Sequence, residues 1–392
     1  MSDFIERIED YGRESYLEIG SIVFPEVFLS SASGLIQRCF KDSRFDYRRN
    51  LLIMAEKDSA KSFMLKNVLG DILRDGMNVG YLSKASVGSI ESSAETEAVY
   101  NTLRTKTVKH FVPSYWMDND IVIISEMNSI FPSSIAQKYE SVLLDLLEDG
   151  KFEKSMIRFA SLGEDEKNRA VKKYKDNNLK IEGAKVSYRV YSPTIMCSHL
   201  NSRLWQRFSP AFYSRFIKCY IPSELKTPEF VKHVFKEGQN AMKKNDGLKE
   251  DFKRISRLKL VGEPKIEDAE IDQIVEEWQD NYGLRNTKIV INTILAKALL
   301  SEHLSESMNQ EGKVVLKPES EDIEYGKKKI QTYVDGENQL DKLTDNGYDP
   351  EKEIFSKLVF DKGMKVEELT KAFGKSRATL FRWQKNLKSQ VS

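Results

Sequence analysis

Residues 51–62 read Leu51-Leu52-Ile53-Met54-Ala55-Glu56-Lys57-Asp58-Ser59-Ala60-Lys61-Ser62. An apolar run leads into a short polar loop that ends in Lys-Ser, and apolar residues at helical spacing follow over 63–73. This order predicts a strand, a phosphate-binding loop and a helix. In such a loop, N–H groups at the helix N-terminus face the phosphates, the lysine reaches the β- and γ-oxygens, and the serine hydroxyl binds Mg²⁺. The alternative is a buried strand, a surface turn and an ordinary helix.

The loop departs from the usual pattern G-x-x-x-x-G-K-[ST], because both glycine positions are occupied by alanine. We still predict that the whole loop and the first residues of the helix contact a nucleotide. The predicted contact residues are Ala55, Glu56, Lys57, Asp58, Ser59, Ala60, Lys61, Ser62 and Phe63.

The composition is that of a soluble globular protein with two or three domains: 392 residues, of which 31% are charged and 40% hydrophobic. With a net charge of +1, the protein as a whole does not attract nucleic acid electrostatically. Any contacts with nucleic acid must therefore come from local basic patches. Three widely spaced cysteines argue against a disulfide framework and fit a reducing compartment. The four histidines show no zinc-ligand spacing with a pair of cysteines.

The N-terminus does not resemble a targeting sequence. Residues 1–7 are acidic and amphipathic, unlike a signal peptide, and no apolar run approaches the length of a membrane helix. We therefore expect a cytoplasmic protein that does not contact a membrane.

Strands and helices alternate from about residue 48 to 222, which predicts an α/β domain with a mostly parallel sheet. The expected strands are 51–54, 79–82, 121–124 and 194–197. Apolar residues at three-to-four spacing predict helices at 266–278, 288–303 and 322–334. The expected domains are a helical N-terminal extension (1–45), the α/β core (46–222), a helical lid (223–335), and a linker with a small basic module (336–392).

A second apolar run, 121–124, ends in Ser125-Glu126, about 65 residues after Lys61. In P-loop ATPases, a strand of this kind carries one carboxylate that holds the Mg²⁺ hydration shell and a glutamate that polarises the attacking water. Here Ser125 occupies the Mg²⁺ position and Glu126 the water-activating position. The alternative is a core strand with a charged residue at its end.

Two further features follow in the order expected of such an enzyme. Ser198 or Asn201, after the strand at 194–197, would sense the γ-phosphate from the end of a neighbouring strand. Arg215, after a short helical segment, would reach the nucleotide of the next subunit as an arginine finger that stabilises charge in the transition state. Taken alone, such an arginine is more often a solvated surface charge.

With these motifs in this order, residues 48–305 resemble the AAA+ ATPases, and among them the minichromosome-maintenance helicases. That family's loop typically reads G-D-P-G-x-A-K-S, with which Ala60-Lys61-Ser62 agrees, and Leu65-Lys66 also fits. The stretch from Gly80 to Gly88 is similar to the segment of the family in which a strand leads into a glycine- and serine-rich stretch. Ile124-Ser125-Glu126-Met127 resembles its I-D-E-F, and Ser214-Arg215-Phe216 matches its S-R-F.

The resemblance implies a homo-oligomer, a hexameric ring that hydrolyses ATP with Mg²⁺ at subunit interfaces and moves DNA through a central channel. It implies a lid arginine near the γ-phosphate, for which Arg285 and Lys288 are the candidates. It also implies a hairpin that offers lysines to DNA, here Lys180 and Lys185 around Glu-Gly. A solvated hairpin or helix is the alternative at that position.

The chain departs from the family in several places. Ala55 and Asp58 replace loop glycines that allow positive φ and close approach of the backbone. Ser125 replaces an aspartate and removes a charge from the metal shell. Only about 45 residues precede the ATPase region, too few for the family's oligonucleotide-binding domain. ATP binding is therefore better supported than fast turnover.

The C-terminal residues 364–387 resemble a helix-turn-helix of the winged-helix type. Val366, Leu369 and Phe373 form one apolar face, Ser376 is a natural N-cap, and apolar residues recur at helical spacing after it. Residues 361–392 contain eight Lys/Arg and three Asp/Glu, which favours DNA binding over a protein-docking hairpin. The predicted DNA contacts are Lys375, Arg377, Thr379, Arg382 and Lys385.

Three functions remain open from the sequence. The first is a DNA-dependent ATPase: a shortened helicase or translocase that acts in DNA replication. A plasmid, a virus or another mobile element would carry such a protein. The second is a slowly hydrolysing, ATP-dependent DNA-binding replication initiator or regulator. The third is a non-catalytic ring or scaffold that no longer binds nucleotide.

Overall fold

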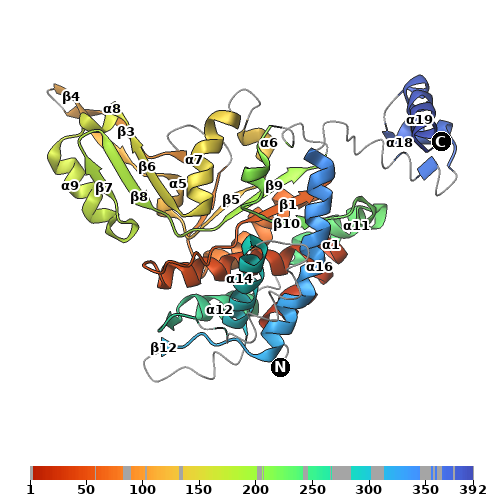
Figure 1. The fold of residues 1–392 in the computed structure, drawn as a ribbon, viewed down its shortest axis with the longest axis horizontal. Coiled ribbons are helices and arrows are strands. Elements are labelled where there is room, and N and C mark those ends of the chain that lie inside the picture. The colour runs from red at the N-terminus through yellow and green to blue at the C-terminus, as the bar shows by residue number, and fades with distance from the viewer. Residues whose placement is uncertain are drawn as a thin grey trace.

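The chain folds around a parallel β-sheet (Figure 1). The computed structural model describes residues 3–57, 59–82, 90–101, 104–131, 136–200, 205, 207–241, 246–264, 266, 284–301, 313–344, 355, 358–359, 364–373 and 376–391. Within these ranges the sheet has five strands in the order β10-β1-β9-β5-β2. They are β1 (Leu51–Ala55), β2 (Val79–Tyr81), β5 (Ile121–Ile124), β9 (Thr194–His199) and β10 (Ile217–Tyr220).

The strands form from apolar runs because both faces of the sheet are covered. Every residue of β1 and β5 is buried, as expected where helices pack on each side of a parallel sheet. The α/β class is confirmed, and the four expected strands are confirmed to within two residues at each end. The prediction does not include β10, whose short sequence Ile-Lys-Cys-Tyr contains a lysine and gives a weak apolar signal.

All neighbouring strands of this sheet run parallel, so their ends gather at two opposite edges. Ala55 pairs with His199, and Ile124 pairs with Met196, at what we call the carboxyl edge. Leu51 pairs with Ile217 at the amino edge. Ligands of open α/β sheets bind at the carboxyl edge, because loops and helix N-termini meet there.

The predicted helix after the loop is confirmed, but its first turns are unusual. It begins as α2 (Lys61–Phe63), continues as the π-helical segment η1 (Met64–Leu69) and ends as α3 (Gly70–Arg74). Its apolar side chains from Met64 to Leu73 are buried in the core, as the spacing predicts, whereas Phe63 is partly exposed. π-Helical turns are rare and often occur at functional sites.

The N-terminal segment forms α1 (Phe4–Cys39), which reverses direction at Tyr16 and Leu17. Leu17 has φ 50° and ψ −144°, so two helical arms run antiparallel. The ring of Phe4 accordingly lies 5.5 Å from that of Phe28. The prediction of helix is confirmed, but the segment is not a separate extension: it is largely buried and packs on helices α11 (Pro228–Ala241) and α14 (Leu284–Leu300).

One expectation about this segment is wrong. Among the described residues, α1 does have the length and hydropathy of a membrane span. However, 94% of its apolar window is buried inside the protein, as in the core helix of a soluble domain. This apolar segment is therefore buried in the core, largely against helices α11 and α14.

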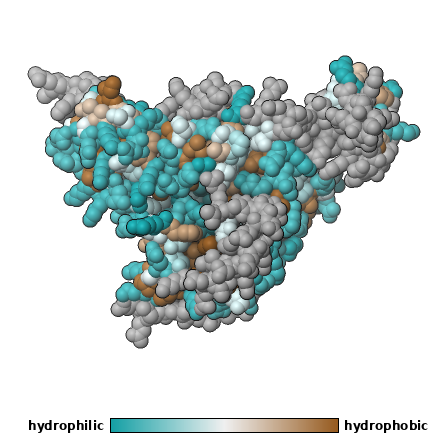
Figure 2. Space-filling view, in the orientation of Figure 1, coloured by the Kyte–Doolittle hydropathy of each residue, from teal (hydrophilic) through white to brown (hydrophobic). Residues whose placement is uncertain are grey.

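A second body of structure is inserted between the strands of the main sheet and projects at the upper left of Figure 1. It includes the ribbon of β3 (Ser93–Asn101) and β4 (Arg104–Val112), which the sequence analysis does not predict. It also includes a small antiparallel sheet in the order β6 (Lys151–Ser155), β8 (Lys185–Arg189) and β7 (Lys180–Glu182). An ion pair joins Lys154 of this sheet to Glu91, two residues before β3 (2.5 Å). We call this body the inserted lobe, and its face in Figure 2 is mostly hydrophilic.

The remaining elements complete the inserted lobe and the core. In and beside the lobe lie α5 (Tyr115–Asp118), α6 (Met127–Ile130), α7 (Ala136–Glu148), β6 (Lys151–Ser155), α8 (Ile157–Ala160), α9 (Glu164–Lys173), η2 (Lys175–Asn177), β7 (Lys180–Glu182) and β8 (Lys185–Arg189). Later in the chain follow α10 (Pro210–Tyr213), η4 (Ser223–Leu225), α12 (Asp246–Ser256), β11 (Lys259–Leu260) and β12 (Lys313–Val314).

The expected lid is helical where the structure describes it. The predicted helices at 288–303 and 322–334 correspond to α14 and α16 (Ser320–Thr344), whereas almost all of 266–278 lies outside the described residues. The expected start of the linker at 336 is wrong, because α16 continues to Thr344. Leu340 and Leu343 are buried in the core there, and this tertiary packing outweighs the polar local sequence.

The C-terminal module has its own small core and lies apart from the main body in Figure 1. Helices α18 (Val366–Phe373) and α19 (Arg377–Val391) pack together around Phe355. Leu380 and Trp383 are buried between them, as predicted. The helix pair fits a helix-turn-helix, and the wing of a winged helix stays a prediction.

Candidate functional site

The loop between β1 and α2 turns through a residue in an unusual conformation. Ala60 has φ 57° and ψ 8°, in the left-handed region, and its carbonyl accepts a hydrogen bond from the N–H of Met64 (2.9 Å). Glycine normally occupies such a position, because Cβ is crowded there. The loop therefore makes its turn into the helix although the glycine of the usual pattern is absent.

The loop wraps around the amine of Lys61, whose residue is only 6% exposed. Its Nζ donates hydrogen bonds to the carbonyls of Ala55 (3.3 Å) and Glu56 (2.5 Å) and to the Oγ of Ser59 (3.0 Å). Ser59 Oγ in turn donates to the Glu56 carbonyl (2.9 Å). A buried ammonium thus lies at the carboxyl edge, inside the ring of main chain that would enclose a phosphate.

Ser62 joins this loop to the end of β5. Its Oγ donates to the carbonyl of Ser125 (3.2 Å), and Glu126 follows directly, partly exposed. The structure therefore brings together the predicted serine, Ser125 and Glu126, which are about 65 residues apart in sequence. Phe63, in the first turn of the helix, is 36% exposed beside them.

Ser198 lies between these groups, on the strand between β1 and β5. It pairs with Met54 one residue before the end of β1, and it is fully buried. Its Oγ has no hydrogen-bond partner within the described part of the chain. A buried hydroxyl without a partner is costly and is expected where a ligand supplies the missing bond. The alternative sensor, Asn201, and the loop residue Asp58 lie outside the described residues.

A residue that the sequence analysis missed holds the loop from its outer side. Lys226, just after η4, donates to the carbonyl of Lys57 (2.6 Å) and lies 3.8 Å from the carboxylate of Glu56. A lysine a few residues after a strand belongs to no motif, so nothing local indicated this contact.

The donor set fits the phosphates of a nucleotide better than a free metal ion. Lys61, the hydroxyls of Ser62 and Ser198, and the turn at Ala60 are groups that bind phosphate oxygens. Over the described ranges, no cluster of three His, Cys, Asp or Glu side chains could hold a metal by itself. Mg²⁺ would therefore depend on the hydroxyls of Ser62 and Ser125 together with phosphate oxygens.

Arg215 lies at the opposite edge of the sheet, between α10 and the first residue of β10. The five residues of β1 separate the two edges, a distance of about 17 Å at the usual rise per residue. The guanidinium is bound to the Glu148 carboxylate, the Ala211 carbonyl and the Ser214 hydroxyl. Arg215 is therefore too far from Lys61 to act on a nucleotide bound to the same chain.

A polar pocket of about 320 Å³ opens beside Arg215 at the amino edge. Lys288, on α14, lines the same pocket and pairs with Asp46 (3.0 Å). Lys288 therefore lies at the same edge as Arg215 and does not face the chain's own loop, and its role near a γ-phosphate stays a prediction. Arg285 lies in the first turn of α14, and its predicted role stays a prediction.

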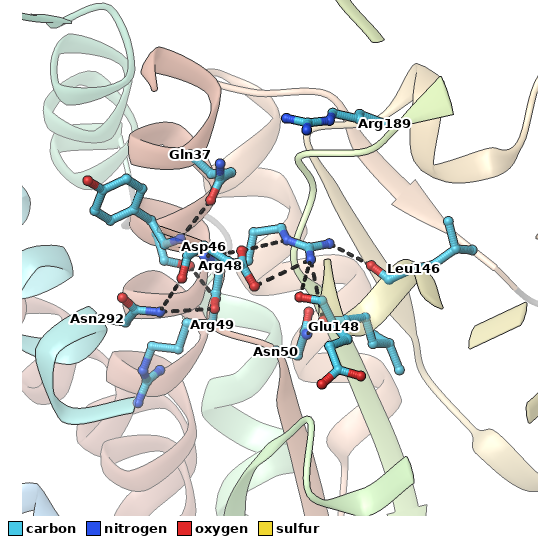
Figure 3. A network of polar contacts seen from close by, with 12 residues as sticks. Gln37, Asp46, Arg48, Arg49, Asn50, Leu146, Glu148, Arg189 and Asn292 are labelled. Carbon is cyan, nitrogen blue, oxygen red and sulfur yellow. Dashed lines mark hydrogen bonds and ion pairs between the residues drawn. The ribbon is translucent and has the colours of Figure 1, made fainter. Parts of the chain in front are cut away.

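Arg48 lines this pocket, and Figure 3 shows its contacts with the end of α7. Its side chain is 2% exposed and donates to the carbonyls of Leu146 (2.7 Å) and Glu148 (3.2 Å) at the end of α7. Those carbonyls have no partner within the helix, so Arg48 caps its C-terminus. The cap holds the helix end that presents Glu148 to Arg215.

The predicted DNA-binding hairpin is confirmed as a hairpin, not a helix. β7 and β8 pair around Gly183, whose φ of +59° fits a tight turn. Lys180 and Lys185 are both exposed there, and Lys185 forms a surface ion pair with Glu153 (2.6 Å). This pair is weak in water and can exchange for a phosphate contact.

In the C-terminal module, the predicted N-cap is confirmed. The N–H of Thr379 donates to Ser376 Oγ (3.3 Å), which caps α19. Arg377 and Arg382 are exposed on α19 and Thr379 is half-buried. Lys385 also lies on α19, and Lys375 lies outside the described residues.

Comparisons with known proteins identify no relative. No protein-family model matches the sequence. A search of curated proteins likewise finds no significant match.

Proposed function

We propose that this chain is an ATPase of the AAA+ type, similar to minichromosome-maintenance helicases, that acts on DNA as a ring of identical subunits. The observation that supports this most is the arrangement at the carboxyl edge. There, Lys61 and Ser62 follow a tight loop, Ser62 contacts the end of β5, and Ser198 presents a buried hydroxyl that has no partner among the residues the structure describes. The sequence order alone does not require these groups to meet.

Each residue has a role that follows from its chemistry. Lys61 would bind the β- and γ-phosphates once its amine exchanges loop carbonyls for phosphate oxygens. Ser62 would ligate Mg²⁺, which lowers the charge on the phosphates when bound. Glu126 would orient the attacking water and accept its proton, and Ser198 would donate to a γ-phosphate oxygen.

Arg215 supports a site shared between subunits. It lies at the edge opposite Lys61, in a pocket that also holds Lys288. In a ring, the amino edge of one subunit would face the carboxyl edge of the next, so both cations would approach the neighbour's phosphates. Arg215 would then exchange its ion pair with Glu148 for the γ-phosphate.

Two surfaces support DNA as the substrate. The hairpin of β7 and β8 exposes Lys180 and Lys185 at the end of the inserted lobe. Helix α19 exposes Arg377 and Arg382 within the basic module. Lysine and arginine at such positions bind phosphates and make the affinity salt-dependent.

The proposal is tested by measuring ATP turnover and binding with and without single- and double-stranded DNA. We expect Lys61→Ala to abolish both turnover and ATP binding, because it removes the buried ammonium from the loop. Lys66→Ala is the matched control, since Lys66 is exposed on the same helix five residues later. ATP binding that survives Lys61→Ala would refute the assigned loop, whereas a wild-type protein that does not bind ATP would favour the non-catalytic scaffold.

A slowly hydrolysing DNA-binding initiator is the second candidate. It is favoured by Ser125, which provides no carboxylate for the metal shell, and by the loop carbonyls that hold Lys61. Strand-displacement assays separate the two functions, because only a helicase unwinds DNA during turnover. Unchanged turnover in Glu126→Gln would show that Glu126 is not the base.

A further inference from the structure

We propose that Asn50 is a positioning residue for Arg215: it fixes the main chain of the finger against the strand that carries Ser198. The inference rests on the proposed function, because it concerns how the shared site is built. Asn50 is 5% exposed and immediately precedes β1, at the amino edge beside the polar pocket (Figure 3). No sequence motif includes it.

The side-chain amide of Asn50 bridges separate segments of the chain. Its Nδ2 donates to the carbonyls of Leu147 (3.1 Å) and Arg215 (3.4 Å), and its Oδ1 accepts from the N–H of Thr194 (2.9 Å). The main-chain carbonyl of Asn50 also accepts from the N–H of Ile217 (2.8 Å). Asparagine suits this place because its amide offers both donors and an acceptor.

These contacts connect both the main chain and the guanidinium of Arg215 to Asn50. The Asn50 amide binds the main-chain carbonyl of Arg215 directly. It also binds the carbonyl of Leu147 near the end of α7, and Glu148 of the same helix binds the Arg215 guanidinium. Asn50 thus sets the position of Arg215 relative to α7. Both polar atoms of the Asn50 amide have partners, and buried hydrogen bonds of this kind rigidify the groups that they join.

The third contact joins Asn50 to the first residue of the strand that carries Ser198. Thr194 is the first residue of β9, and Ser198 lies four residues later, beside the phosphate loop. The finger that serves a neighbour is therefore bonded to the strand that carries the sensor of the chain's own site. Loss of the amide would release the finger while leaving Lys61 and Ser62 in place.

The test is ATP turnover in mixtures of variant subunits. In a shared site, Lys61→Ala and Arg215→Ala subunits complement each other, because one supplies an intact finger and the other an intact loop. We expect Asn50→Ala alone to lose turnover by about tenfold or more, as for a misplaced catalytic group. Its affinity for ATP should stay within about twofold of the wild type, because the loop is intact.

The mixtures then locate the defect. We expect Asn50→Ala to regain turnover when mixed with Lys61→Ala, which supplies an intact finger, and to gain nothing when mixed with Arg215→Ala. The opposite pattern, unchanged turnover, or an equal loss of ATP affinity would overturn the inference. If Lys61→Ala and Arg215→Ala do not complement each other, the shared site itself is wrong and this inference falls with it.

Asn292→Ala is the matched control. Asn292 is a buried asparagine of the same pocket, and its Nδ2 donates to the carbonyls of Asp46 (3.1 Å) and Arg48 (3.2 Å) without contacting the Arg215 segment. Its loss should affect thermal stability but not complementation. Should Asn50→Ala fail to fold, Asn50→Asp keeps the acceptor for Thr194, and the same mixtures are expected to give the same pattern.

Discussion

At the scale of single residues, Ala60 shows how the candidate phosphate loop turns without the usual glycine. Its φ of 57° places the Cβ in the crowded left-handed region, which costs an alanine about 1 kcal/mol. The surrounding contacts outweigh this cost: Lys61 is bound by three loop oxygens, and Lys226 holds the outer side of the loop. The strain is therefore stored at the candidate site.

We expect Ala60→Gly to raise the free energy of unfolding, by up to about 1 kcal/mol, because glycine relieves the left-handed strain. The measurement is denaturant unfolding at pH 7. Ala170→Gly is the matched control: Ala170 is buried in helix α9, where the same change should destabilise the protein by about 1 kcal/mol. Equal destabilisation by both changes would show that Ala60 is not strained.

At the scale of elements, α1 is a helical hairpin held by a close crossing of its arms. A Cβ on Gly12 would lie 2.5 Å from the carbonyl oxygen of Gly20, so only glycine permits this distance. The reversal at Leu17 lets an apolar segment bury itself against the sheet and helices. Side-chain contacts between the two arms, such as that of Phe4 with Phe28, hold the hairpin together.

Gly12→Ala is expected to destabilise the protein by about 1–3 kcal/mol, because the added methyl group forces the arms apart. Thermal and denaturant unfolding measure the change. Gly247→Ala serves as its control, since Gly247 lies in α12 and the methyl group of an alanine there would meet no described atom within 4 Å. Alanine at that position should leave stability unchanged or slightly raised. A harmless Gly12→Ala would mean that the arms do not cross closely.

At the scale of the whole molecule, a buried ionic network joins α1, the start of β1, α14 and α16. Arg49, 1% exposed, binds the Glu26 carboxylate, the Tyr333 hydroxyl (2.5 Å) and Thr293 Oγ1 (3.1 Å). Lys329 of α16 also pairs with Glu26 (3.1 Å). Burial by itself would raise the pKa of Glu26, but Arg49 and Lys329 together hold that pKa below its ordinary value.

Because the pKa of Glu26 is lowered in the folded protein, its contribution to stability is present above about pH 4.5 and is lost as the pH falls through the folded pKa. We expect Glu26→Gln to lower the free energy of unfolding at pH 7 by about 3–5 kcal/mol, because it leaves buried cations without their partner. The acid-induced loss of stability should also become shallower in the variant.

Glu9→Gln is the comparison for that change. Glu9 forms an exposed ion pair with Arg13 (3.0 Å), worth at most about 1 kcal/mol. Unfolding curves at a series of pH values from 7 downward give both results. Identical pH profiles for the wild type and Glu26→Gln would show that this carboxyl does not carry the acid sensitivity.

Local sequence determined much of this protein. The apolar runs of β1 and β5, the helix after the loop and the cap at Ser376 were predictable, because strand burial, helical periodicity and capping depend on residues close together in the chain. The presence of a lysine and serine at the end of a strand was equally visible. These features fix the elements and the candidate loop.

Only the tertiary structure decided how those elements form a site. The left-handed turn at Ala60, the reversal of α1, and the separation of Arg215 from Lys61 all depend on contacts between distant segments. Asn50 contacts residues 97 to 165 positions away in the sequence. Sequence periodicity reports which side of an element is buried, but it contains no information about what is packed against that side.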